Sequence, residues 1–86
     1  GKVESLKANF SASIYPNPVN NNLLIELSKN GQYQLEIVDV QGRTVNRVQF
    51  SGDQWKGTFT DYASGMYWIK ITDEMGGIAM KRVFKN

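Results

Sequence analysis

The chain is 86 residues long and carries 10 Lys and Arg against 8 Asp and Glu, a formal net charge of +2. It has no cysteine and no histidine, so disulfides, thiol chemistry and an unshifted side-chain titration near neutral pH are all excluded. A chain of this length folds as one small domain that buries only about 60–65% of its unfolded surface. It has no apolar run of the roughly 18–20 residues that a membrane-spanning helix needs.

The first part of the chain predicts a lead-in, a short strand and a stiff corner. Residues 1–9 are polar and without a clear period, so we expect a linker there and a domain over residues 10–86. Residues 10–15 alternate like a short strand. Both prolines of the chain, Pro16 and Pro18, follow directly. Because proline fixes its own φ and holds the preceding residue extended, this corner cannot lie inside a sheet.

The rest of the chain predicts short strands separated by turns, because apolar residues alternate between clusters of Gly, Asn, Asp and Ser. The expected strands are residues 23–27, 33–40, 44–50, 55–60, 66–72 and 78–84. The expected turns are residues 20–22, 28–31, 39–43, 51–53, 61–65 and 73–77. Seven short strands without a helical period predict an all-β fold, an immunoglobulin-like antiparallel β-sandwich.

Several residues carry specific expectations within this pattern. Asn30-Gly31 is a strong hairpin signal. Gly42 lies in a tight turn and is expected to adopt a positive φ. The side chains expected to face the core include either Trp55, Gly57 and Phe59 or the opposite set. Tyr67, Ile69 and Ile71 are expected on one face of their strand, and Met66, Trp68 and Lys70 on the other.

Catalytic and metal sites find little support in the sequence. Nucleophilic catalysis needs a nucleophile beside a base, and no serine lies in a nucleophile-elbow sequence, so we expect no enzyme and no cofactor. A calcium site needs clustered carboxylates. Four aspartates lie at expected turns, where Asp commonly forms local hydrogen bonds: Asp39, Asp53, Asp61 and Asp73. Calcium binding stays open only if two of these turns meet at one end of the sandwich.

Two binding functions can be weighed from the basic and aromatic residues. Acidic residues are interspersed among the basic ones and most aromatics alternate as in a core, so we expect no nucleic-acid binding. Sugar stacking would use Trp55, Trp68 and Tyr33, although at least two of the three are expected to pack inside. The alternative function is therefore a carbohydrate- or protein-binding β-sandwich module appended to a secreted enzyme or adhesin.

Five motifs occur in a fixed order along nearly the whole chain. They are Tyr15-Pro16-Asn17-Pro18-Val19, Leu23-x-Ile25, Leu35-x-Ile37-x-Asp39-x-x-Gly42-Arg43-x-Val45, Ser64-Gly65-Met66-Tyr67-x-Ile69 and Lys81-x-Val83. In this order, over residues 14–85, the chain resembles the type A C-terminal sorting domain of the type IX secretion system. One departure is that the segment before Asp61-Tyr62 is less apolar than the Leu-x-x-Leu usual there, which leaves the register of the fifth strand open.

The resemblance implies a non-catalytic signal that directs a cargo protein across the outer membrane and is afterwards cleaved or used for surface attachment. The expected partners are the type IX translocon and a sortase-like cysteine protease at the outer membrane, with residues 1–9 as the cleavage neighbourhood. The expected localisation is the periplasm in transit, then the cell surface or the medium. Open strand edges are also expected to let two copies of the domain pair.

The resemblance also divides the motif residues into two groups. The residues expected to be read by the translocon are Lys81, Arg82, Val83 and Lys85. The residues expected to be mainly structural are Tyr15, Pro16, Asn17, Pro18, Asp39, Gly42, Gly65 and Tyr67.

Overall fold

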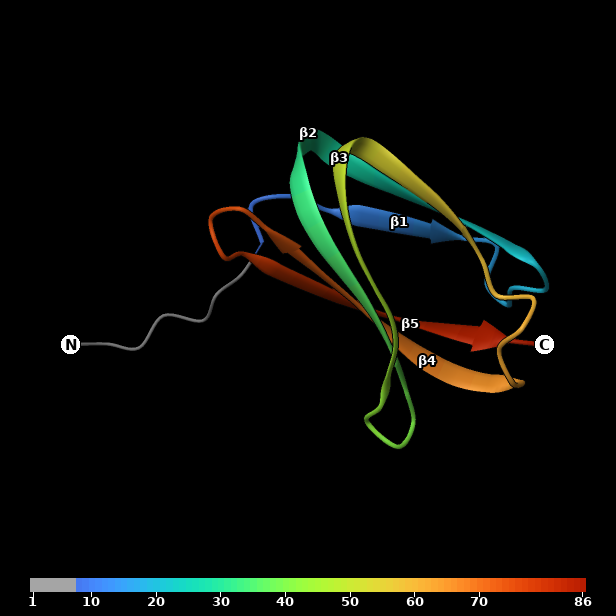
Figure 1. Ribbon diagram of the computed structural model, residues 1–86. Coiled ribbons are helices and arrows are strands. Elements are labelled where there is room, and N and C mark those ends of the chain that lie inside the picture. The colour runs from blue at the N-terminus through green and yellow to red at the C-terminus, as the bar shows by residue number, and fades with distance from the viewer. Residues whose placement is uncertain (1–7) are drawn as a thin grey trace.

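The computed structural model describes residues 8–86, and within them the chain forms five β-strands (Figure 1). These are β1 (Ala12–Tyr15), β2 (Asn22–Asp39), β3 (Thr44–Thr58), β4 (Gly65–Asp73) and β5 (Ile78–Lys85). All pairings between these strands are antiparallel, so the prediction of an all-β, antiparallel fold is confirmed. Of the lead-in expected over residues 1–9, residues 1–7 lie outside the described part of the chain.

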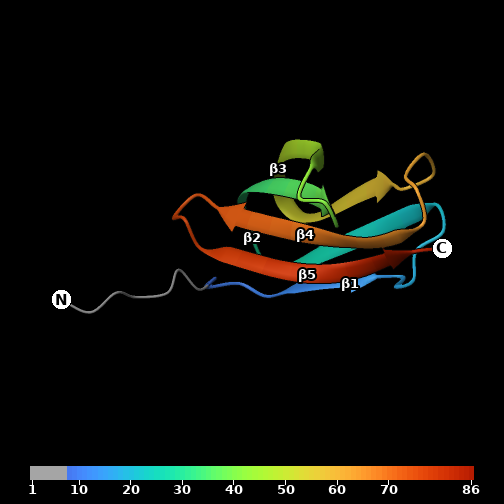
Figure 2. The same ribbon diagram turned by 90° about the horizontal axis from the view of Figure 1, so that it is seen from below.

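The long strand β2 organises the sheet. Its first half pairs with β1, where Ala12 lies opposite Leu27, and its second half pairs with β4, where Tyr33 lies opposite Asp73. Along its other edge, β2 pairs with β3 over both halves, and β5 pairs with the far side of β4. The sheet curls so that β1 comes into contact with β5, as Figures 1 and 2 show.

Five strands replace the seven expected because two predicted turns lie inside long strands. Residues 28–31 belong to β2 and residues 51–53 belong to β3, so the predicted Asn30-Gly31 hairpin is wrong. Gly31 and Gly52 are cross-strand partners, and the pairing is irregular just before Gly31. The glycines and polar residues therefore mark one shared bend of a continuous hairpin, where both strands change direction together.

One hydrophobic core joins both halves of the curled sheet. The fully buried side chains are those of Phe59, Leu23, Ile25, Leu35, Ile37, Ile69, Ile71, Val19 and Val83. Ile69 and Ile71 lie inside together with Tyr67, as their alternation predicts. Val19 comes from the corner after β1 and Val83 from the last strand. The two ends of the domain therefore contribute to the same core.

The structure contains a repeated unit. A pattern of Gly, Tyr, two aliphatic residues, Asp and Gly runs from Gly31 to Gly42 and again, with the same spacing, from Gly65 to Gly76. The two copies lie side by side in β2 and β4 and run antiparallel. Tyr33 of the first copy lies opposite Asp73 of the second, and Asp39 lies opposite Tyr67. The two copies are thus related by a local twofold arrangement.

The two copies also form the same local contacts. The hydroxyl of Tyr33 donates to the carbonyl of Lys29 at 2.7 Å, and that of Tyr67 donates to the carbonyl of Ala63 at 2.6 Å. In each turn the last glycine of the pattern donates its N–H to the aspartate carbonyl, at 3.0 and 3.1 Å, with φ of +85° and +87°. The repeat is therefore structural as well as sequential: Tyr33 holds the bend inside β2, and Tyr67 holds the segment just before β4.

Candidate recognition site

The corner between β1 and β2 lies against the outer edge of β5. The N–H of Val19 donates to the carbonyl of Phe84 at 2.7 Å, and the N–H of Asn86 donates to the carbonyl of Val19 at 2.9 Å. Val19 and Lys85 form an isolated parallel bridge. Both prolines lie outside the strands, as predicted, and both of their peptide bonds are cis. The corner thus covers the edge of β5 that faces away from β4.

The side chain of Asn17 completes this cover. Its Oδ1 accepts a hydrogen bond from the N–H of Phe84 at 2.9 Å, and its Nδ2 donates to the carbonyl of Arg82 at 3.2 Å. The amide of Asn17 thereby occupies the place of a neighbouring strand. Nearer the C-terminus, the Nδ2 of Asn86 donates to the Oδ1 of Asn20 at 2.9 Å. These contacts, which we call the connector clasp, join Asn17, Val19 and Asn20 to Arg82, Phe84 and Asn86.

The remaining corner residues, Tyr15, Pro16 and Pro18, flank the clasp. Tyr15 ends β1, is 43% exposed, and donates its hydroxyl to the Oε1 of Glu26. That hydrogen bond to a carboxylate raises the pKa of Tyr15 above its usual value of 10.0. Pro16 lines a shallow apolar groove together with Tyr15 and Leu24. Pro18 is held between the two clasp residues on either side of it in the chain.

The four β5 residues predicted to be recognised do not share one surface. Val83 is fully buried and belongs to the core. Arg82 alternates with Lys81 and Lys85, so its side chain lies on the opposite face of the strand. The Nζ of Lys85 donates to the carbonyl of Asn86 at 2.9 Å. The structure therefore separates a buried residue, two lysines at the inner rim, and an arginine on the outside.

Arg82 belongs to a surface on the outside of β4 and β5. Its guanidinium lies 5.9 Å from the centre of the Trp68 ring, within the range of a cation–π contact. Phe84 and Met80, on the same face of β5, are 47% and 52% exposed. Their cross-strand partners on β4 are Met66 and Lys70. We call this surface the β4–β5 outer face: Met66, Trp68, Lys70, Met80, Arg82 and Phe84.

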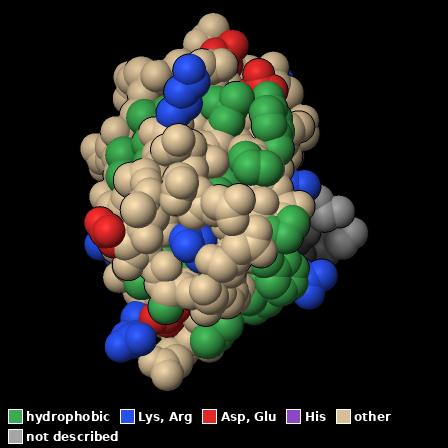
Figure 3. Space-filling model, turned by 90° about the vertical axis from the view of Figure 1, so that its right-hand side faces the viewer, with side chains coloured by type: hydrophobic (Ala, Val, Ile, Leu, Met, Phe, Trp, Pro, Cys, Tyr) green, Lys and Arg blue, Asp and Glu red, His purple; other side chains and the backbone are tan. Residues whose placement is uncertain are grey.

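Sequence reasoning placed half of this surface correctly. The alternation of residues 66–72 put Met66, Trp68 and Lys70 on one face, opposite the buried Tyr67, and the register confirms it. Met80 and Phe84 were missed, although they alternate with buried residues of the last strand in the same way. At the end of the molecule where the chain terminates, hydrophobic side chains lie among scattered Lys and Arg side chains (Figure 3). The β4–β5 outer face itself combines apolar Met80 and Phe84 with the cation of Arg82.

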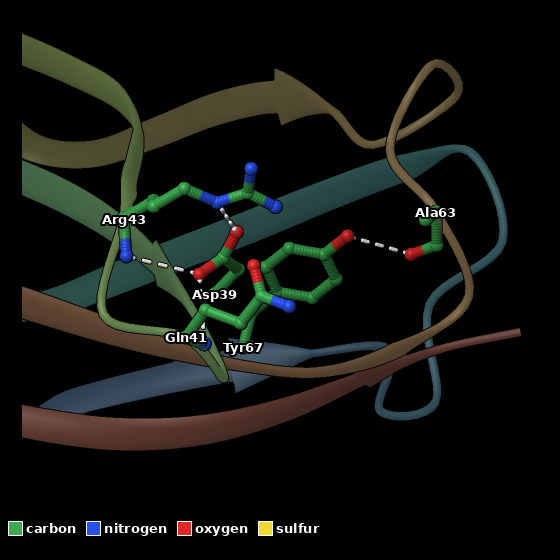
Figure 4. A network of polar contacts seen from close by, with 5 residues as sticks. All are labelled: Asp39, Gln41, Arg43, Ala63 and Tyr67. Atoms are coloured by element: carbon green, nitrogen blue, oxygen red, sulfur yellow. Dashed lines mark hydrogen bonds and ion pairs between the residues drawn. The ribbon is translucent and has the colours of Figure 1, made fainter.

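Asp39 closes the turn between β2 and β3 (Figure 4). Its Oδ1 accepts the N–H groups of Gln41 and Arg43, both at 2.9 Å, and its Oδ2 accepts the Nε of Arg43 at 2.9 Å. The main-chain N–H of Arg43 is the largest cause that lowers the pKa of Asp39, partly opposed by desolvation. Every contact of this carboxylate lies within its own turn, which gives it a structural role.

Tyr67, Gly42 and Gly65 also hold local geometry. Tyr67 is buried, and its ring lies 5.6 Å from those of Phe59 and Tyr62. Gly42 has φ of +85°, as its turn position predicts, and Gly65 has φ of +140°. Side chains other than glycine rarely adopt these conformations. In Figure 4 the ring of Tyr67 extends from β4 toward Ala63, beside the Asp39 turn.

The structure leaves little basis for a sugar platform or a calcium site. Tyr33 is buried as expected, whereas Trp55 is only partly buried and packs against the rim of the core. The turns that carry Asp39 and Asp73 lie at opposite ends of the paired β2 and β4. Within residues 8–86 there is no group of three or more acidic, His or Cys side chains that could hold a metal ion.

Comparison with known families places the chain. The profile of the secretion system C-terminal sorting domain matches residues 13–86. A search of curated proteins found no match. Residues 8–86 contain no helix long and apolar enough to cross a membrane. The family match begins in β1 and runs through the whole connector clasp to the last residue. The chain therefore belongs to the C-terminal sorting domains of the type IX secretion system, which engage its machinery and direct export to the cell surface or the medium.

Proposed function

We propose that this domain, over residues 10–86, is a folded, non-catalytic export signal, and that the translocon recognises its last strand, β5. The observation that carries the proposal is the β4–β5 outer face. It combines half-exposed Phe84 and Met80 with the cation of Arg82 on the strand that ends the domain. Phe84 lies opposite Met66 of β4, and a contiguous exposed apolar patch commonly marks an interaction site. Lys81 and Lys85 add positive charge at the rim of the same strand.

The other motif residues hold β5 in place but are not themselves recognised by the translocon. Val83 anchors β5 in the core, and the connector clasp holds its outer edge. Pro16 and Pro18 fix the corner that presents Asn17 and Val19 to that edge. Under this proposal, loss of a corner residue lowers export only as far as it loosens the fold.

The proposed route follows the family. A separate N-terminal signal takes the cargo across the inner membrane, and the domain folds in the periplasm. The translocon then recognises it, and a sortase-like cysteine protease at the outer membrane removes it by cleavage within residues 1–9. Membership of the sorting-domain family supports this order of events.

Deleting the last residues cannot test the proposal cleanly. A truncation before residue 81 removes Val83 from the core together with half of the connector clasp, so it would unfold the domain. The sharper test replaces two exposed side chains, Arg82→Ser with Phe84→Ser, in the full 86-residue chain fused to a periplasmic reporter. The main-chain groups of both residues stay in place, so the clasp is retained.

A matched control removes one apolar and one basic side chain elsewhere. Leu24 and Lys56 are cross-strand partners on the outside of β2 and β3, and neither of these strands pairs with β5. We expect the Arg82→Ser, Phe84→Ser fusion to stay in the periplasm with an unchanged thermal midpoint, and the Leu24→Ser, Lys56→Ser fusion to be exported. Export of the first fusion at the wild-type level would refute the proposed reading of β5.

A further inference from the structure

β3 has one paired edge and one open edge. Among the described strands it pairs only with β2, although it is 15 residues long. An open edge carries unpaired N–H and C=O groups that can bind another strand. The fold covers the corresponding outer edge of β5 with the connector clasp. Within residues 8–86 no segment does the same for β3.

The clasp also fixes which main-chain groups lie on the open edge. The N–H and C=O of Phe84 point away from β4. Main-chain N–H and C=O groups point to alternate sides along a strand. The cross-strand pairs therefore show, strand by strand from β5 through β4 and β2, which residues of β3 point toward β2 and which point away from it. By this alternation, the main-chain groups of Arg47, Gln49 and Ser51 point away from β2 toward the open edge, while those of Val48 bond to β2.

We propose that this edge pairs with the same edge of a second copy of the chain, antiparallel, with Phe50 at the twofold axis. A twofold interface must be self-complementary, so each residue before the axis meets one after it. Arg47 and Asp53 lie at equal separations on either side of Phe50. The twofold axis therefore sets Arg47 of each copy opposite Asp53 of the other, which gives two such pairs in the dimer.

The charges select this register. Sliding the two strands so that Gln49 meets Gln49 preserves the hydrogen-bonding edge but sets Asp53 opposite Val45. Sliding the other way sets Arg47 opposite Trp55. Among registers that preserve the hydrogen-bonding edge and pair residues within β3, only the Phe50-centred one sets opposite charges across from each other, and like charges directly opposite weaken pairing.

The two charged residues are accessible for this role. The side chain of Arg47 is 62% exposed while its Nη2 lies 3.1 Å from the Oε2 of Glu36, so it can also meet a second carboxylate. Asp53 is exposed and forms no ion pair within the described part of the chain. Residues 48–52, between Arg47 and Asp53, include no charged residue and no proline. Charges and prolines are what usually prevent an edge strand from pairing with another chain.

Cysteine cross-linking tests the register directly, because the natural chain has no cysteine. Gln49 and Ser51 of the second copy would be a hydrogen-bonded pair with Cα atoms about 5.5 Å apart, a separation that a disulfide spans. We expect Gln49→Cys mixed with Ser51→Cys to form a disulfide heterodimer under mild oxidation. Each variant alone places its cysteines beyond the roughly 7 Å limit and should stay unlinked. Equal cross-linking in all three samples would overturn the register.

A charge exchange tests the partner. Asp53→Lys and Arg47→Glu each set like charges across the axis, and we expect each to weaken self-association in sedimentation velocity by about tenfold. Their mixture restores both opposite-charge pairs and should associate as a heterodimer near the wild-type level. Glu74→Lys, a charge change in the β4–β5 turn, is the control and should dimerise like the wild type. A wild-type chain that stays monomeric at every concentration, or a mixture that fails to associate, would overturn the proposal.

Discussion

The Oδ1 of Asn17 accepts a hydrogen bond from the main-chain N–H of Phe84, which lies 67 residues further along the chain. This contact ties the motif at the entrance of the domain to its last strand. A change in the corner therefore alters how β5 is held, even though the corner is far from it in sequence. The corner contacts the main chain of β5, whereas the outer face of β5 is formed by side chains. Substitutions in the corner and substitutions of β5 side chains can therefore be tested separately.

Replacing Asn17 with Ala should loosen the last strand. It removes the hydrogen bonds to the N–H of Phe84 and the carbonyl of Arg82, and each is worth about 0.5–1.5 kcal/mol. We expect a loss of about 1–2 kcal/mol in the free energy of unfolding by urea, with faster amide exchange at Phe84. Asn22→Ala is the control, because that exposed side chain forms no hydrogen bond within residues 8–86. Equal stability of the two variants would show that the clasp contributes nothing.

Asp39 should make the domain sensitive to acid. The hydrogen bonds from Arg43 lower its pKa in the folded protein below the usual 3.8, so the folded state binds this proton more weakly than the unfolded state. Its contribution to stability is complete above pH 3.8 and is lost as the pH falls through the lower folded-state pKa. Asp39→Asn lacks this titration. The stability gap between the wild type and Asp39→Asn in urea unfolding should shrink with acidification below pH 3.8, and a gap independent of pH would contradict this assignment.

Gly57 should be intolerant of even one methyl group. A Cβ at this position would overlap the ring of Trp55, so the indole must leave its place. We expect Gly57→Ala to cost about 1–3 kcal/mol and to shift the fluorescence of Trp55 to the red, measured with Trp68→Phe to remove the second tryptophan. Gly31→Ala is the control, since its nearest contact would be 3.4 Å. An unshifted spectrum would mean that Trp55 does not cover Gly57.

The repeated unit predicts matched effects at its two tyrosines. Tyr33→Phe and Tyr67→Phe each remove one hydroxyl that donates to the carbonyl four residues earlier. Each variant should lose about 0.5–1.5 kcal/mol of stability in thermal or urea unfolding, by similar amounts. A loss in one variant alone would show that the two copies are not equivalent.

The alternation of apolar residues predicted the core and the faces of β4 because burial on one face imposes that period directly. Turn residues were a poorer guide. Gly31 and Gly52 each signal a reversal when considered singly, yet they face each other across β2 and β3 and mark a shared bend. Only the strand pairing distinguishes a chain reversal from a bend inside a continuous strand, and local sequence does not determine that pairing.

The clasp was equally beyond local sequence rules, because Asn17 finds partners that only the folded chain brings near. The repeat, by contrast, was available from the sequence. Comparing the chain with itself aligns Gly31 with Gly65, Tyr33 with Tyr67 and every later position of the pattern. That alignment would have predicted two equivalent hairpins and a register between their strands.

Under the proposed function, the corner affects export only through the stability of the fold, while the translocon recognises the outer face of β5. The most direct measurement combines Pro16→Ala and Pro18→Ala in the full-length reporter fusion and compares its export with the urea stability of the isolated 86-residue chain. We predict that export falls only in proportion to the lost stability, so that a core variant outside β5 with the same measured loss, chosen from Ile25→Val and Ile25→Ala, is exported equally well. Normal stability with lost export in the proline variant would contradict the account, because the corner itself would then be read.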